Sequence, residues 1–361
     1  MKIHFHRRDS AFALLIAMIA IFVLSILAAG LAYSMKIESR LAMRSSNEPQ
    51  MIRLGKSGVQ LASWVIAQEA SVPNQPYDSL NQIWAGGSGS TGETNSVLAG
   101  FSMENYAISN GTVSVKIVDL DRYANINTAS ASELQQALTL MGVDADEMAI
   151  VADSIQDWVQ AGDNPRIAGA KTDYYQSLPT PYNCKEAPID DISELLLVRG
   201  IRDDPVIYWG GCSTNHPGYA FQHKLGIGSS PGQQECFQYG LKDLFTPFSA
   251  GRININTADA NVLQLLPGVD ANVAAAILQI RAGPDGVDGT EDDAPFRSVN
   301  DLVMAGINSS LVAELNRYAS VRSSVFQATI TAKIGDDEKV FKAILTRNNR
   351  NVQTVEFYCD K

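Results

Sequence analysis

The hydrophobic pattern begins with one long apolar run. Residues 10–35 contain no charged side chain, and the first nine residues include Lys2, Arg7 and Arg8. As a helix with 1.5 Å rise per residue, the run would reach about 39 Å, enough to cross a hydrocarbon core of about 30 Å. The pattern therefore predicts a membrane-spanning helix whose basic end stays in the cytoplasm, with the rest of the chain on the other side.

A removed secretory signal peptide is the alternative interpretation of this segment. Such signals have an apolar region of about 7–15 residues followed by a small-x-small cleavage site. Ala28 and Ala29 resemble such a site, but the apolar run is longer and continues past them. The length of the run favours the membrane helix.

A helical pattern continues beyond the apolar run, through residues 36–70. Pro49 lies within it and is expected to kink or break the helix. In the second part, apolar positions recur every three or four residues, at Leu54, Val59, Ala62, Val65 and Ile66. This spacing predicts an amphipathic helix whose apolar stripe packs on a globular body.

Alternating strand patterns occur at two separate places in the rest of the chain. The first surrounds Asn110-Gly111, which is typical of a type I′ hairpin, and follows a loop-like segment at 71–100. Three further strands are expected between residues 325 and 359, whereas residues 125–320 are mostly helical in pattern. The sequence predicts an α+β fold, in which a long N-terminal helix packs on an antiparallel sheet split by a large helical insertion.

A long helix that lies half in lipid and half on a globular domain resembles the type IV pilin fold. The stretch from Arg7 to Leu15, with basic residues, a small residue and then an apolar helix, also resembles a prepilin-type signal. The resemblance implies that a prepilin peptidase cuts between Ala11 and Phe12, and that the new N-terminus is methylated. A cut after Ser10 is the alternative, because the family usually has Gly where this chain has Ala11.

The fifth residue after the first of these cuts is Ile16, where most pilins and pseudopilins have Glu. In that family the glutamate meets the N-terminal amine of a neighbouring subunit, because an unpaired carboxylate in lipid is costly. Ile16 therefore indicates a subunit with no neighbour above it, although any membrane helix would also have an apolar residue there.

These segments give the expected domain organisation. At about 150 residues per domain, 361 residues correspond to about two globular units. The expected parts are a prepilin leader (1–11), the transmembrane half of the helix (12–35), its periplasmic half (36–70), a pilin-like β domain (71–124 and 321–361) and an inserted helical domain (125–320).

The insertion contains an internal repeat. Residues 124–158 and 253–283 both contain Asn-Ile-Asn-Thr-Ala, and both then turn at Gly-Val-Asp, at Gly142 and Gly268. Thr128 and Thr257 are placed to cap the helices that follow them. The repeat resembles helix-hairpin-helix units, which often bind the DNA backbone. A membrane-anchored DNA receptor of the competence type is therefore one candidate function.

The charge balance argues against DNA binding. The chain has 28 basic and 39 acidic residues, and its net charge is −11. Residues 253–320 alone contain three basic and nine acidic residues. Since binding to a phosphate backbone needs a cationic surface, we expect the repeats to be packing modules and expect no nucleic-acid partner.

A longer pattern lies between and around the two repeats. Its positions are Asp157-Trp158, Asp163, Pro165, Gly169-Ala170, Tyr174-Tyr175, Pro188 and Ser193-Glu194-Leu195. In order and spacing it resembles the minor pseudopilin K family of type II secretion systems, which has D-W-x-D-x-D, then G-A-E-x-x-Y-Y, then S-E-L. Gln160 stands where the family has an acidic residue, and Lys171 stands where it has Glu.

The resemblance implies a structural function without catalysis. Pseudopilin K lies at the tip of a periplasmic pseudopilus with the minor pseudopilins I and J, and the three initiate and cap the fibre during protein export. The implied location is the inner membrane, crossed once, with the C-terminal domain in the periplasm. A minor pilin of a type IV pilus remains an alternative. The sequence has four histidines and no Ser/His/Asp or Cys/His signature of a catalytic site.

Two acidic clusters are candidate metal sites. The first has five carboxylates in nine residues: Asp285, Asp288, Glu291, Asp292 and Asp293. The second contains Asp157, Asp163 and Asp173, with Lys171 among them. Dense hard oxygen ligands suit Ca²⁺, and the resemblance implies calcium in this domain. A solvated acidic loop is the alternative.

The four cysteines contain no C-x-x-C pair. In the periplasm we expect disulfides, and four cysteines permit three pairings. Cys212 with Cys236 is the favoured pair, because both flank a Gly/Ser/Pro-rich loop at 213–235. Cys184 and Cys359 are further disulfide candidates, and unpaired buried cysteines are the alternative.

Overall fold

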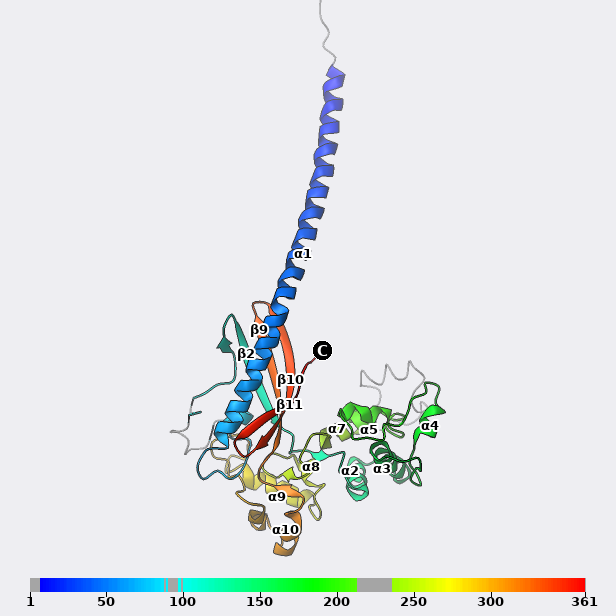
Figure 1. Cartoon of the computed structure of the whole chain (residues 1–361), viewed down its shortest axis with the longest axis vertical. Helices are drawn as coiled ribbons and strands as arrows, with labels where there is room; N and C mark the ends of the chain where they lie inside the picture. Colours follow the sequence, from blue (N-terminus) through cyan, green and yellow to red (C-terminus); the bar gives the residue numbers. More distant parts are fainter. Residues whose placement is uncertain (1–6, 88, 90–96, 99, 213–235, 361) are drawn as a thin grey trace, which may run out of the picture.

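A long helix projects from a body that has two parts, a sheet packed on the helix and a helical region beyond it (Figure 1). The computed structural model describes residues 7–87, 89, 97–98, 100–212 and 236–360. The two parts have separate hydrophobic cores, one between the helix and the sheet and one inside the helical region.

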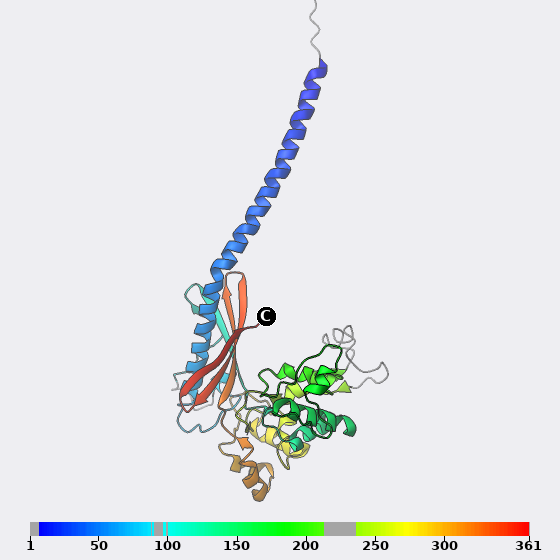
Figure 2. The same cartoon turned by 45° about the vertical axis from the view of Figure 1, so that its right-hand side comes forward.

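Helix α1 (Arg7–Glu69) is continuous and has Pro49 inside it. Of the two outcomes predicted for Pro49, a kink or a break, the break is therefore wrong, and Figure 2 shows that the continuous helix changes direction where it reaches the sheet. Among the described residues, α1 is the one helix long and apolar enough to cross a membrane. The side chains before Met51 are almost all exposed, and the packed part of the helix begins there.

Five antiparallel strands form the sheet, in the order β1-β2-β9-β10-β11. Their bounds are β1 (Tyr106–Ile108), β2 (Gly111–Asp119), β9 (Val325–Ile334), β10 (Asp337–Asn348) and β11 (Asn351–Cys359). The three predicted C-terminal strands are confirmed. Strands β2 and β9 pair directly although the helical region lies between them in sequence, so that region leaves and rejoins the sheet between neighbouring strands.

The turn between β1 and β2 is centred one residue earlier than predicted. Ile108 pairs with Gly111, so the turn residues are Ser109 and Asn110, and Ser109 has a φ of 56°. Gly111 is needed inside the strand instead, because a Cβ there would lie 2.5 Å from the Lys333 carbonyl oxygen. Close packing between strands thus overrides the local preference of Asn-Gly for the turn.

The predicted apolar stripe of α1 is confirmed, because all five of its side chains are buried against the sheet. Gly58 lies on the same part of the helix, where a Cβ would come within 2.4 Å of Cγ2 of Ile330 on β9. The helix and the sheet therefore approach too closely for any side chain at this position.

We expect Gly58→Ala to destabilise the chain by about 1–3 kcal/mol, although Ala is the better helix former, because the added methyl group overpacks the contact with β9. Gly30→Ala is the matched control, since a Cβ at Gly30 meets no atom within 4 Å. Urea unfolding in detergent measures both variants. Equal midpoints for the two would contradict the close packing of α1 on β9.

The helical region contains two similar helix pairs. In the first, α2 (Ala131–Met141) packs on α3 (Ala145–Val159), and in the second α8 (Ala260–Leu263) packs on α9 (Ala271–Arg281). A two-residue strand precedes each helix pair and bonds in parallel to a later strand: β3 (Ala124–Asn125) with β6 (Phe245–Thr246), and β7 (Ile253–Asn254) with β8 (Ala319–Ser320). The sequence repeat is therefore also a repeat of local structure.

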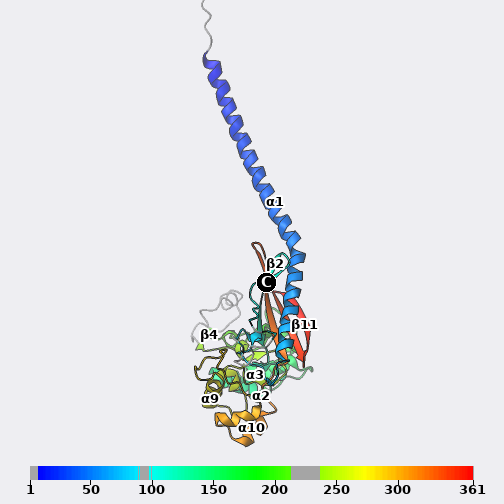
Figure 3. The same ribbon diagram turned by 90° about the vertical axis from the view of Figure 1, so that its left-hand side faces the viewer.

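The other described elements are short. They are η1 (Ile83–Ala85), α4 (Thr172–Gln176), η2 (Ile192–Leu197), α5 (Val206–Trp209), β4 (Gly211–Cys212), β5 (Cys236–Phe237), α7 (Leu241–Leu244), η4 (Val299–Ala305) and α10 (Ser309–Leu315). Figure 3 shows α9 and α10 at the end of the molecule opposite the free end of α1.

The predicted helix caps at Thr128 and Thr257 are wrong. Ser130 caps α2 by accepting a hydrogen bond from the Glu133 N–H at 3.2 Å. The residue before α8, Asp259, makes no side-chain cap, and Thr257 donates its hydroxyl to Asp119 instead. Tertiary hydrogen bonds to the sheet domain therefore take priority over local capping at Thr257.

Candidate functional site

The exposed half of α1 is the most apolar surface of the molecule. Phe12 is 67% exposed and Ile16 is 53% exposed, and exposed large apolar side chains continue along the helix to Met35. A helix with this surface fits a single-pass membrane anchor. Of the predicted cleavage site, the Ala11 backbone is helical, whereas the Ala11 side chain and residues 1–6 lie outside the described residues.

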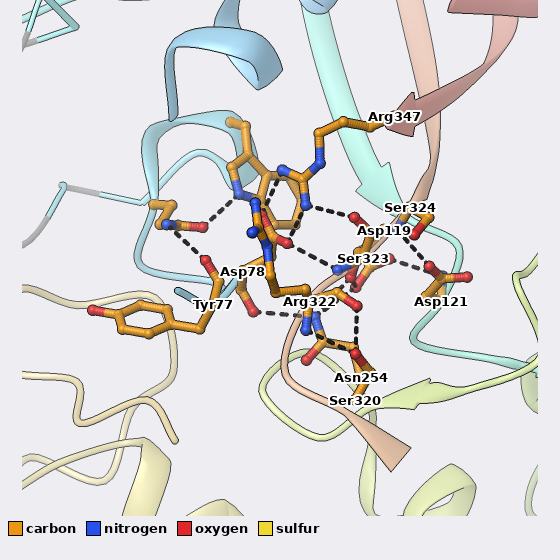
Figure 4. A network of polar contacts seen from close by, with 12 residues as sticks. Tyr77, Asp78, Asp119, Asp121, Asn254, Ser320, Arg322, Ser323, Ser324 and Arg347 are labelled. Atoms are coloured by element: carbon orange, nitrogen blue, oxygen red, sulfur yellow. Dashed lines mark hydrogen bonds and ion pairs between the residues drawn. The ribbon is translucent and has the colours of Figure 1, made fainter. Parts of the chain in front are cut away.

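A buried polar network joins the helical region to the sheet (Figure 4). This junction network consists of Asp78, Asp119, Asp121, Asn254, Ser323 and Arg347. They come from the segment after α1, the end of β2, the second repeat, the return to β9, and β10. All six residues are more than nine-tenths buried. The network therefore fixes where the insertion leaves and rejoins the sheet.

The ion pair of the network links Arg347 to Asp78. The Arg347 Nη1 lies 2.8 Å from Asp78 Oδ1, and Nη2 binds Oδ2; the two side chains are 3% and 2% exposed. Ser323 completes the pair, because its N–H donates to Asp78 Oδ2 at 2.8 Å and its carbonyl accepts from Arg347. The guanidinium also lies over the Phe326 ring, 5.1 Å from the centroid. Because both charges are buried, removing either partner would leave the other buried without a compensating charge.

Asp119 is the second buried carboxylate of the network. It accepts hydrogen bonds from Thr257 and Ser323 hydroxyls at 2.5 Å and from Asn254 Nδ2 at 3.2 Å. Burial, and the charge of neighbouring Asp121, raise the pKa of Asp119 to about 7, against the opposing effect of the hydroxyl donors. Burial also raises the pKa of Asp121. The network therefore contains a carboxyl group that changes charge near neutral pH.

The repeated Asn-Ile-Asn motif has a defined hydrogen-bonding role that its residue types alone do not reveal. In both copies the first Asn accepts from the N–H of the second, which is Asn127 or Asn256. The second Asn then binds both backbone groups of a distant residue, Ile189 in one copy and Phe296 in the other. The repetition of the motif was the one sequence signal for this role, and the role is to hold distant backbone segments together inside the helical region.

The first acidic cluster forms a closed loop after α9. Arg281, whose side chain is 3% exposed, pairs with Asp288 at 2.7 Å and donates to two carbonyls of the second repeat. Asp292 accepts from the Asp285 N–H and the Thr290 hydroxyl, and Asp293 accepts from the Gly289 N–H. Among the described residues, no three acidic, His or Cys side chains are grouped to hold a metal ion.

The structure does not bring the second acidic cluster together. Asp157 is 1% exposed and pairs with Arg166, Nη1 to Oδ1 at 2.8 Å, whereas Asp163 and Asp173 are exposed. Gly169 closes over the same carboxylate, because a Cβ there would lie 2.0 Å from Asp157 Oδ2. The three predicted ligands Asp157, Asp163 and Asp173 are therefore not brought together in this structure, and Arg166 and the turn at Gly169 surround the one buried carboxylate.

The described cysteines divide into bonded and free ones. Cys236 is disulfide-bonded, and its backbone lies directly opposite Cys212 in the β4–β5 pair. This register fits the predicted Cys212–Cys236 pairing across the 213–235 loop, which itself lies outside the described residues. Cys184 and Cys359 are free, so the further disulfide candidates are wrong. Cys184 is buried in the helical core and Cys359 is exposed on β11, in a different part of the molecule.

Comparison with known proteins points to one family. The family model described as type II secretion system protein K matches residues 113–206, which run from β2 through α2, α3 and α4 to the start of α5. The type II secretion system protein K of Pectobacterium carotovorum subsp. carotovorum is 34% identical over 64 residues. That alignment spans 18% of this chain and 20% of the length of the Pectobacterium protein. The predicted resemblance to pseudopilin K is confirmed.

The fold is similar to a solved structure. A chain in the crystal structure of the GspK-GspI-GspJ complex from the enterotoxigenic Escherichia coli type 2 secretion system matches with a TM-score of 0.60 and 17% identity. The match covers 88% of this chain and 99% of that chain. The mixed architecture, a long N-terminal helix on an antiparallel sheet with a helical insertion, is therefore a known one.

Proposed function

We propose that this chain, whose residues 113–206 match type II secretion protein K, is a minor pseudopilin at the tip of a type II secretion pseudopilus. The observation that carries the proposal is the position of this match. It begins in β2 and continues through the first helix pair, so it includes one strand of the sheet and the first part of the insertion. The chain acts by occupying a place in a fibre, and catalysis has no part in this function.

The arrangement of the two ends supports a position at the tip. The insertion lies at the end of the body away from the apolar half of α1 (Figure 1). A pseudopilus grows by stacking subunits whose apolar helices form its axis, so a bulky domain beyond the sheet leaves no space for a subunit above it. An apolar Ile16 agrees with this, because such a subunit needs no carboxylate partner for a neighbour's amine.

The proposal also includes processing and location. A prepilin peptidase would remove residues 1–11 and leave N-methylated Phe12 as the first residue of a subunit held in the inner membrane, with its body in the periplasm. The mass of the intact protein from native membranes tests this step. A chain that begins at Phe12 supports it, whereas a retained Met1 or a cut near Ala29 contradicts it.

The partners would be the minor pseudopilins I and J, by analogy with the complex named for the matching crystal structure. Co-expression of the three full-length subunits and purification in detergent through a tag on this chain tests the assembly. A complex of all three is expected. Selective assembly with type IV minor pilins would favour a minor pilin of a type IV pilus instead. Binding to duplex DNA at low salt would favour the DNA receptor.

We infer that the two helix pairs are helix-hairpin-helix-like packing modules. Both Asn-Ile-Asn motifs are used for internal hydrogen bonds, as described above. The glycines at the turns have positive φ, 86° at Gly142 and 70° at Gly268, and a Cβ at Gly268 would lie 2.8 Å from Leu311. The second turn therefore packs on α10, and the acidic balance of 253–320 disfavours a phosphate ligand.

Calcium at residues 285–293 is the remaining part of the proposal. Gly286 and Gly289, with φ of 71° and 91°, fold five carboxylates into a tight loop of hard oxygen donors. Asp288 is held by Arg281, so a bound ion would use mainly the remaining carboxylates, which must turn toward one another. The residues fit calcium in chemistry but need this rearrangement.

Calcium is accordingly expected to raise the melting temperature of metal-free protein. At a hundred times Kd the stabilisation is about 2.7 kcal/mol, and each kcal/mol corresponds to about 2–4 °C. Asp292→Asn with Asp293→Asn should abolish the effect, whereas Asp336→Asn, in the exposed β9–β10 turn, should retain it. An unchanged melting temperature at millimolar calcium would contradict calcium binding.

A further inference from the structure

A buried lysine occupies the place where the second metal site was expected. Lys171 is 5% exposed, and its ammonium donates to the carbonyl oxygen of Asp157 at 2.7 Å and to the carbonyl of Gln160. Both carbonyls belong to the last turn and C-cap of α3, where main-chain oxygens have no partner within the helix. Two converging oxygens at the negative end of a helix dipole make a site for a cation.

The surrounding charges explain why this cation is a side chain. Arg166 binds the Asp157 carboxylate and also donates to the Gln160 side chain at 2.8 Å, so a second fixed cation lies at the same helix end. Asp153 accepts from the Ala168 N–H at 3.0 Å, and Asp163 and Asp173 are exposed. Lys171 and Arg166 already balance the buried Asp157 carboxylate and the half-buried Asp153 carboxylate, and this neutral environment disfavours a divalent ion.

We propose that the Lys171 ammonium is the resident cation of this oxygen site and takes the place of a bound metal. The lysine holds the end of α3 against the start of α4, which begins at Thr172. The same region contacts Cys184, whose Sγ lies 3.5 Å from the Asp157 carbonyl and whose N–H donates to Thr172. This half of the insertion therefore folds independently of divalent cations, whatever the loop at 285–293 binds.

Amide hydrogen exchange of the full chain in detergent provides a local test. With Lys171→Met, which keeps the stem and removes the charge, exchange at residues 156–162 should become about tenfold faster or more, since charge-assisted hydrogen bonds are lost. With Lys171→Glu the same segment should loosen in EDTA and regain protection in millimolar Ca²⁺, because the balanced charge of the site becomes negative. In the wild type, calcium should leave this segment unchanged.

Two controls separate this site from the rest of the protein. Lys116→Glu makes the same charge change on an exposed lysine of β2. It should change neither the exchange rate of residues 156–162 nor the response of that segment to calcium. Protection at 285–293 is read in the same experiment, so a calcium effect there does not bear on Lys171. Calcium-dependent protection of 156–162 in the wild type, wild-type exchange in Lys171→Met, or no calcium rescue of Lys171→Glu would each overturn the proposal.

Discussion

Replacing Arg347 with Met is expected to destabilise the protein by about 3–5 kcal/mol, one of the two largest effects we expect. The substitution leaves the Asp78 carboxylate buried with its ion-pair partner gone, and a buried charge without compensation costs several kcal/mol. The Ser323 carbonyl loses a donor at the same time. Because this cluster ties the segment after α1 to β10, we expect the whole sheet domain to lose stability.

Urea unfolding of the detergent-solubilised chain measures the effect. Arg350→Met removes the same charge from an exposed position in the β10–β11 turn and should shift the free energy of unfolding by less than about 0.5 kcal/mol. Asp78→Asn combined with Arg347→Met should be less destabilised than Arg347→Met alone, because no unpaired charge remains. Similar midpoints for Arg347→Met and Arg350→Met would show that the pair contributes little.

The sequence predicted the helices and strands whose structure depends on the periodicity of apolar residues. The stripe from Leu54 to Ile66 has helical spacing, and its burial against the sheet followed from that spacing alone. The alternation in β9, β10 and β11 similarly predicted three strands of one sheet. In both cases the neighbours that determine the structure lie within a few residues along the chain.

The junction network could not be predicted in this way. Asp78 and Arg347 are 269 positions apart, and Asp119 and Asn254 are 135 apart, so no periodicity links them. Thr257 shows the consequence: its sequence neighbours favour a helix cap, but the tertiary contact with Asp119 determines its hydrogen bond. The ion pairs of the acidic clusters escape the sequence for a related reason, because spacing reveals carboxylates but not whether Arg166 and Arg281 bind them.

Asp119 is expected to make stability fall as pH rises from about 4 to about 7. Its pKa in the folded protein is raised from 3.8 to about 7. The folded state therefore binds the proton more tightly than the unfolded state, and the stabilisation is complete below pH 3.8 and lost as pH passes 7. A pKa raised from 3.8 to about 7 corresponds to a change on the order of 4 kcal/mol across this range.

Asp119→Asn isolates this contribution, because an amide at this position is a neutral group that can still accept from the Asp121 N–H and donate to the hydroxyls of Ser323 and Thr257. Free energies of unfolding measured from pH 4 to 8 should show the wild type losing stability relative to the variant as pH rises. Carboxyl groups away from Asp119 titrate alike in both proteins and cancel in this difference, whereas neighbouring Asp121 is coupled to Asp119 and contributes to it. Asp163→Asn, at an exposed carboxylate, should follow the wild-type curve. Parallel curves for Asp119→Asn and the wild type would mean that Asp119 is already ionised in the folded protein at pH 4, and that its hydroxyl and amide donors outweigh its burial.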